Sequence, residues 1–277
     1  MTLSKRNFFF KAGIGLSAVF CALTLVCAAI VLPLFPAVVS DVTRRVDGVF
    51  QGIIVRFFES RPYAPFFSIL CAVLYAFVTI ILIYRYFEKT RCLEILFFGF
   101  FVFSFAFEAC RVMAPLSLKY AFPGLYLTMA SRCVLFGRYL GLFSLFAASV
   151  CASGLELEKQ RSVIWVIILI TLAIAVGTPI DSLAWDSSLC MIRAYPTMFS
   201  TIEACLSIGI LLSFFIASYT RRSSEYFFVG IGTALALLGR NLLYTTDTWL
   251  SPVPALLALI AGTWLVCTHL HRVYLWL

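Results

Sequence analysis

Eight apolar stretches of roughly 20 residues each constrain what this chain can fold into. A helix of about that length spans a hydrocarbon core about 30 Å thick, because each residue adds about 1.5 Å. Apolar residues make up 62% of the chain and charged residues 12%, whereas soluble domains are about 45–50% apolar and about 25% charged. The sequence therefore predicts an all-α integral membrane protein, a bundle of about eight transmembrane helices forming a single polytopic membrane domain, 1–277. The predicted spans are 12–35, 64–84, 93–112, 124–154, 163–180, 198–219, 226–245 and 252–269.

The segment between the first two spans, 36–62, has a different pattern. Apolar residues recur at helical spacing from Val39 to Phe57, and Arg44, Arg45 and Arg56 fall between them. This pattern is typical of an amphipathic helix that lies on the outer membrane surface. An extracytoplasmic cap packed on the end of the bundle would explain it equally well.

The basic residues of the connecting segments predict the orientation. The segments on the side of the termini hold 11 Lys and Arg against five acidic residues, and the opposite segments hold six of each. The positive-inside rule then places both termini in the cytoplasm, in a plasma or cytoplasmic membrane. This distribution accounts for most of the net charge of +8, so we expect no nucleic-acid partner. Tyr195 and Tyr244 fit an aromatic belt at the outer interface.

Several ionisable residues interrupt the predicted spans. They are Glu108, Arg111, Arg132, Arg138, Glu203 and Arg240, and Asn241 follows the last of them. Counted from the cytoplasmic end of each span, Glu108, Arg138, Glu203 and Arg240 all lie at roughly 21–24 Å. Because an unpaired charge in hydrocarbon is costly, we expect the two carboxylates to pair with arginines at this level. Arg111 and Arg132 are expected just above it, near the outer interface.

Three roles are compatible with such a layer. Two acids and four arginines leave a surplus of two positive charges, which predicts a site for a small anionic solute or a lipid headgroup that enters from the outer side. In the alternative, the Glu–Arg pairs fix the register of the helices and bind nothing. A third role, proton or ion coupling through Glu108 or Glu203, is also compatible with the residue types.

The sequence offers no signature of catalysis or of a cofactor. It contains no nucleotide-binding glycine motif and no H-E-x-x-H, and His269 and His271 are two residues apart, so they diverge on a helix and do not predict a metal site. We expect no catalytic residue, metal or cofactor. The leading hypothesis is a small carrier, or an accessory subunit of one, with an outward-facing anion pocket. The alternatives are a non-catalytic sensor or scaffold subunit with a membrane-protein partner, and a membrane-embedded enzyme that acts on lipid.

Overall fold

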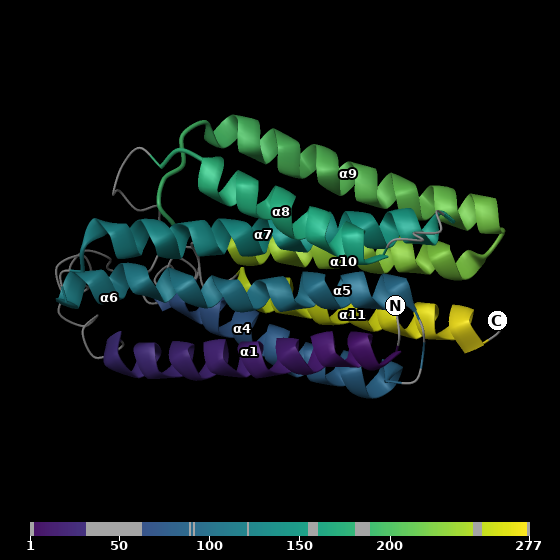
Figure 1. The fold of residues 1–277 in the computed structure, drawn as a ribbon, viewed down its shortest axis with the longest axis horizontal. Coiled ribbons are helices and arrows are strands. Elements are labelled where there is room, and N and C mark those ends of the chain that lie inside the picture. Colours follow the sequence, from purple (N-terminus) through teal and green to yellow (C-terminus); the bar gives the residue numbers. More distant parts are fainter. Residues whose placement is uncertain are drawn as a thin grey trace, which may run out of the picture.

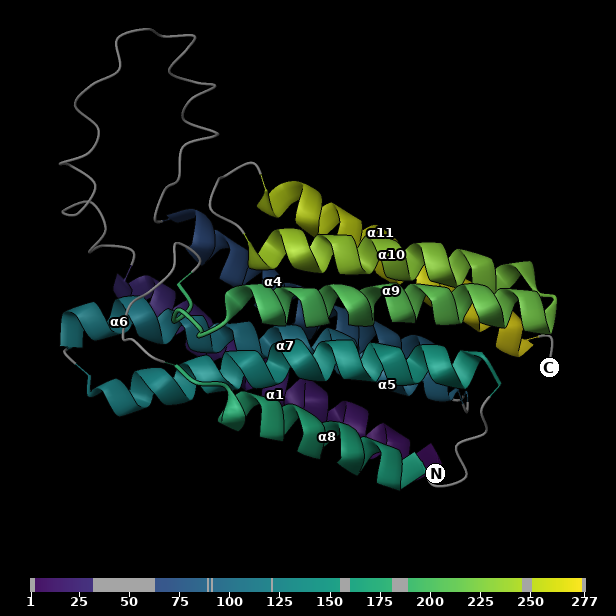
Figure 2. The same ribbon diagram turned by 90° about the horizontal axis from the view of Figure 1, so that it is seen from above.

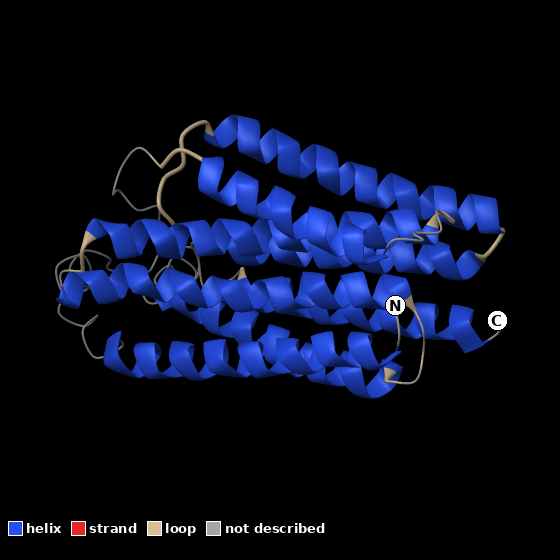
Figure 3. Ribbon diagram, in the orientation of Figure 1, coloured by secondary structure: helices blue, strands red, loops and turns tan. Residues whose placement is uncertain are grey.

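The prediction of an all-α membrane bundle is confirmed by the structure, a computed structural model that describes residues 3–31, 63–88, 90, 92–120, 122–154, 160–180, 189–245 and 251–275. These residues form helices and short connections, without a strand (Figure 3). The helices are α1 (Leu3–Val31), α4 (Tyr63–Phe87), α5 (Leu93–Ser104), the 3₁₀ helix η2 (Phe105–Val112), α6 (Met113–Tyr120), α7 (Gly124–Ala152), α8 (Gln160–Gly177), α9 (Pro196–Arg221), α10 (Ser224–Tyr244) and α11 (Pro252–Leu275). The predicted amphipathic segment, 36–62, lies outside the described residues.

Seven of the described helical segments are long and apolar enough to cross a membrane. One of them is continuous through α5, η2 and most of α6, so it extends well beyond the predicted end at Val112. The segment predicted as the fifth span, 163–180, forms the shorter apolar helix α8, whose apolar part runs from Ser162 to Gly177. At about 1.5 Å per residue this part measures about 24 Å, which is shorter than the hydrocarbon core.

Helix α7 lies in the middle of the bundle and contacts α5, η2, α8 and α9 (Figures 1 and 2). Helices α10 and α11 form the most extensive helix pair, and α4 lies between α1 and α11. Leu3 and Leu275 lie at the same end of the bundle (Figure 1). We call this end the terminal face and the opposite end the distal face.

Arg6 belongs to the bundle, although the first span was predicted to begin only at residue 12. Helix α1 already begins at Leu3, and Arg6 is 5% exposed. Its Nη2 donates to the carbonyl oxygens of Phe87 at 2.6 Å and of Glu88 at 2.8 Å. The last carbonyls of a helix lack partners within the helix, so Arg6 caps the C-terminus of α4 and ties α1 to it.

Candidate functional site

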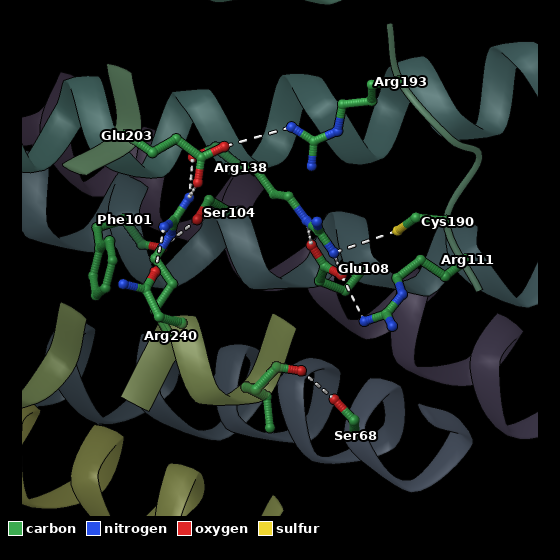
Figure 4. A network of polar contacts seen from close by, with 12 residues as sticks. Ser68, Phe101, Ser104, Glu108, Arg111, Arg138, Cys190, Arg193, Glu203 and Arg240 are labelled. Carbon is green, nitrogen blue, oxygen red and sulfur yellow. Dashed lines mark hydrogen bonds and ion pairs between the residues drawn. The ribbon is translucent and has the colours of Figure 1, made fainter. Parts of the chain in front are cut away.

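A buried carboxylate, Glu108 on η2, lies between two guanidiniums. Arg138 on α7 binds it in a bidentate manner, with Nε at 2.8 Å from Oε1 and Nη2 at 3.1 Å from Oε2. Arg111 donates from Nη1 to the same Oε2 at 3.0 Å (Figure 4). Glu108 is 1% exposed. Because both carboxylate oxygens accept charge-assisted hydrogen bonds, the ionised form of Glu108 is well compensated in a setting that excludes water.

The 3₁₀ conformation of η2 places Glu108 and Arg111 on the same side of the chain. A 3₁₀ helix has three residues per turn, so side chains three apart eclipse, whereas in an α-helix they diverge by about 60°. Runs of more than three or four residues in this conformation are uncommon, and η2 has eight. The ion pair between Glu108 and Arg111 is thus supported by the local backbone as well as by Arg138.

Arg138 reaches Glu108 because α7 approaches α5 and η2 closely at two glycines. A Cβ built on Gly137 would lie 2.5 Å from Cβ of Phe107 and 3.0 Å from the carbonyl oxygen of Ser104. A Cβ on Gly141 would lie 2.5 Å from the hydroxyl oxygen of Ser104. Small residues allow helices in membranes to pack backbone against backbone, and here they bring the guanidinium within bonding range.

Replacing Gly137 with alanine is expected to destabilise the protein by about 1–2 kcal/mol, because the new methyl group overlaps Phe107 next to its backbone. Thermal unfolding in detergent measures the change. Gly15→Ala on α1 is the matched control, because no atom lies within 4 Å of the added Cβ and alanine favours a helix over glycine. Equal midpoints for the two variants would contradict the close approach at Gly137.

A second carboxylate, Glu203 on α9, lies between two more arginines. Arg193 Nη1 is 3.5 Å from Oε1 of Glu203, and Arg240 Nη2 is 3.6 Å from Oε2. These ion pairs are longer than those of Glu108, and the side chain of Glu203 is 23% exposed. The Glu203 pairs are therefore looser and more accessible than the Glu108 pairs.

Arg240 on α10 connects the ion pairs of Glu203 with those of Glu108. Its Nη2 donates to the carbonyl oxygen of Arg138 at 3.3 Å, and its Nη1 donates to Oδ1 of Asn241 at 2.9 Å. The ring of Tyr244 lies 4.4 Å from Cζ of Arg138 and 4.8 Å from Cζ of Arg240. Both distances suit cation–π contacts, so one buried ring stabilises two guanidiniums. The predicted place of Tyr244 in an interfacial belt is wrong, since the residue is 6% exposed.

The segment from Leu189 to Tyr195 covers the network from the connection between α8 and α9. Cys190 accepts a hydrogen bond from Nη2 of Arg138 at 3.4 Å, and Arg193 pairs with Glu203. Leu189 and Tyr195 both have a φ of 58°, a conformation that is strained for bulky residues. The contacts of Cys190 with Arg138 and of Arg193 with Glu203 are made from between these two left-handed residues.

Among the described residues we define the Glu–Arg network as Glu108, Arg111, Arg138, Cys190, Arg193, Glu203, Arg240, Asn241 and Tyr244. Without counting Arg111, the network contains three guanidiniums and two carboxylates. They belong to Arg138, Arg193 and Arg240 and to Glu108 and Glu203. Two buried polar atoms around them make no hydrogen bond within the described part of the chain, namely Nε of Arg240 and the hydroxyl oxygen of Tyr244. Such groups are costly in a protein interior, so the network has both positive charge and hydrogen-bonding capacity to offer a further group.

The structure brings together six of the seven residues that the sequence placed in the layer. Arg132 is the exception, because no contact among the described residues joins it to the network and its Nε is buried without a hydrogen bond. Arg132 and Arg138 are six residues apart, which turns their side chains about 120° away from each other on α7. Sequence reasoning missed Cys190, Arg193 and Tyr244. The spacing of Tyr244, four residues after Arg240, is the one signal that could have found any of them.

The histidines near the C-terminus lie apart from the network and from each other. His269 pairs with Glu225 and stacks on Phe228, whereas the ring of His271 packs edge-on against Phe87. Across the described ranges, no group of three or more His, Cys, Asp or Glu side chains lies close enough to hold a metal ion.

Comparison with known proteins adds no relative to this picture. No family model, no curated protein and no solved structure matches the chain.

Proposed function

We propose that this integral membrane protein binds a small anionic group, a carboxylate or a phosphate, at the Glu203 half of the Glu–Arg network. The observation that carries the proposal is Arg240, which is 1% exposed. Among the described residues its Nε has no hydrogen-bond partner, its ion pair to Glu203 is loose, and the hydroxyl of Tyr244 beside it also has no partner. A guanidinium presents its donors in a fixed fork that matches carboxylate and phosphate oxygens.

Glu203 occupies the place that the anion would take. Its contacts to Arg193 and Arg240 are ion pairs at 3.5 and 3.6 Å, longer than the 2.7–2.9 Å typical of charge-assisted hydrogen bonds. Glu203 thus acts as a resident counterion, and the bound anion displaces it from the two guanidiniums. Access is from the Arg193 side, where side chains are 20% and 23% exposed. Glu108 keeps its two arginines and holds the site together.

The positive-inside rule predicts that this site faces the outside of the cell. Glu203 lies near the start of α9 and Arg240 near the end of α10, and both helix ends lie toward the distal face (Figure 1). A small carrier, or an accessory subunit of one, would use such an outward-facing anion site. The role of a membrane-embedded enzyme fits less well, because both oxygens of Glu108 are engaged by guanidiniums and cannot readily give or take a proton.

The test is the thermal unfolding of detergent-purified protein in acetate, succinate and phosphate, with chloride at the same ionic strength as the reference. A ligand that binds only the folded state raises stability by about 2.7 kcal/mol at a hundred times its Kd. We expect a saturable rise in the wild-type midpoint, its loss in Arg240→Gln, and its retention in Arg222→Gln, which removes an exposed arginine at the other end of α9.

Glu203→Gln separates binding from a purely structural role, because the two roles predict different results. If Glu203 competes with the anion, its neutralisation tightens anion binding, and the midpoint rises at lower anion concentration. A layer that only holds helices together would show no anion response, either in the wild type or in Glu203→Gln. A wild-type midpoint that responds equally to all four salts would overturn the proposal.

The second candidate function is a non-catalytic sensor or scaffold subunit, and the Glu108 half of the network favours it. This half is closed, bidentate and almost fully buried, as expected for pairs that fix helix register. Co-purification of a membrane-protein partner, together with no anion response, would support this function.

A further inference from the structure

Two cysteines face each other across the contact between η2 and α7. Helix α7 returns from the distal face antiparallel to α5 and η2 (Figure 1), and Gly137 on α7 lies against Phe107 on η2. The thiols of Cys110 on η2 and Cys133 on α7 interact with each other beside this contact. Both cysteines are free, Cys133 is exposed and Cys110 is partly exposed.

The pitches of the two helices place these cysteines in register. From Gly137 to Cys133 is about one turn of α-helix, four residues that span about 6 Å and return nearly to the same face. From Phe107 to Cys110 is one turn of 3₁₀ helix, three residues that also span about 6 Å and return to the same face. Because the two segments are antiparallel, both steps run toward the distal face. Cys110 therefore lies opposite Cys133 for the same reason that Phe107 lies opposite Gly137.

The separation of the two backbones at this contact suits a disulfide. A Cβ built on Gly137 would lie 2.5 Å from Cβ of Phe107, and a Cβ on Gly141 would lie 3.2 Å from Cβ of Ser104. Cysteines joined by a disulfide have Cβ atoms about 3.5–4.5 Å apart. The backbones need to separate only slightly from Gly137 to Cys133 to reach this range.

From this register we infer that Cys110 and Cys133 form a redox-active dithiol, and that its oxidation to a disulfide fixes η2 to α7 in the 3₁₀ conformation. With α-helical pitch, Cys110 would turn about 60° away from the face of Phe107 and lie about 1.5 Å closer to it along the axis. The disulfide thus forms from the 3₁₀ state and holds it. Glu108 and Arg111 are eclipsed in the same state, so oxidation also preserves their ion pair.

The oxidant is a second disulfide, and the reaction is thiol–disulfide exchange. The thiolate of the exposed Cys133 attacks one sulfur of the oxidant, whose S–S bond breaks and releases one thiolate. The thiolate of Cys110 then attacks the Cys133 sulfur of this mixed disulfide, forms the new S–S bond and releases the second thiolate. The protons lost by the two cysteines go to the two released thiolates, so the cysteine pair loses two electrons and the oxidant gains them. The positive-inside rule predicts that the pair lies toward the outside of the cell, where disulfides persist.

The experiment treats the reduced, detergent-purified full chain with dithiodipyridine, a membrane-permeant disulfide, and maps the products by mass spectrometry of unreduced peptides. We expect a pair of peptides linked through Cys110 and Cys133. The link should be absent from Cys133→Ser and present in Cys205→Ser, which removes another exposed cysteine as the control. No reaction at Cys133, a lasting mixed disulfide on it, or a link from Cys110 to Cys190 instead would overturn the proposal.

A second measurement tests the register. Gly137→Ala forces α7 away from η2, so we expect the link to form about tenfold more slowly. Gly15→Ala is the matched control, because its added Cβ meets no atom within 4 Å. Equal rates in the two glycine variants would contradict the register.

The thermal midpoint tests whether the link fixes η2 to α7. We expect the oxidised wild type to unfold at a higher temperature than the reduced protein, because the link closes a loop in the unfolded chain. Cys133→Ser should show no such difference. Equal midpoints of the oxidised and reduced wild type would overturn the fixing of η2.

Discussion

Replacing Glu108 with glutamine is expected to lower the free energy of unfolding by about 3–5 kcal/mol, the cost of leaving a buried charge without its partner. The glutamine side chain has nearly the same shape, but Arg111 and Arg138 would then share no carboxylate in a region where Glu108 is 1% exposed. Denaturant or thermal unfolding in detergent measures the loss.

The control for this prediction is Glu203→Gln, because Glu203 also lies between two arginines but is 23% exposed and more loosely paired. Its expected cost is about 1 kcal/mol or less. The double variant Glu108→Gln/Arg138→Gln should recover part of the loss, because it removes one of the uncompensated charges. If Glu108→Gln costs no more than Glu203→Gln, the Glu108 pairs do not hold the bundle together.

Replacing Gly262 with alanine is expected to cost about 3 kcal/mol, the upper end of the usual range for overpacking. A Cβ on Gly262 would lie 2.6 Å from the carbonyl oxygen of Gly232 and 2.7 Å from the amide nitrogen of Ala236. Both atoms belong to the backbone of α10, so no side chain can rotate away and the two helices must separate. Unfolding of the purified variant measures the cost.

The same substitution should weaken the anion response, because α10 also holds Arg240 in place beside Arg138. Gly15→Ala serves as the control here as well, with an expected gain of about 0.5–1 kcal/mol from helix propensity. A Gly262→Ala protein with wild-type stability would mean that α10 and α11 can adjust their spacing without loss.

The apolar runs were sufficient to predict the class of fold, because lipid leaves few choices for a chain of this composition. The site was harder to predict. Arg132 and Arg138 share a helix, but only their angular separation on α7 distinguishes the residue that joins the network from the one that does not. Arg193 lies outside any predicted span. Its position depends on the left-handed backbone at Leu189 and Tyr195, and the periodicity of apolar residues does not predict such a loop conformation.

The environment of Tyr244 could not be predicted from the sequence either. A tyrosine near the end of a span is usually interfacial, but this one is buried between two guanidiniums. Its environment depends on which face of α10 packs against α7. The pattern of apolar and polar residues within one helix does not predict which helices become neighbours in the bundle. The sequence pattern thus predicts which residues are costly to bury, whereas the packing decides which of them meet.

The eight-residue 3₁₀ segment also sets the length and the rotation of the continuous helical rod from Leu93 to Tyr120. A 3₁₀ helix rises about 2.0 Å per residue and turns about 120°, against about 1.5 Å and about 100° for an α-helix. Conversion of η2 to α-helical pitch would therefore shorten the rod by about 4 Å and rotate Met113–Tyr120 by about 160° relative to α5. The ion pairs of Glu108 lie in the middle of this segment, so they oppose a conversion of η2 to α-helical pitch.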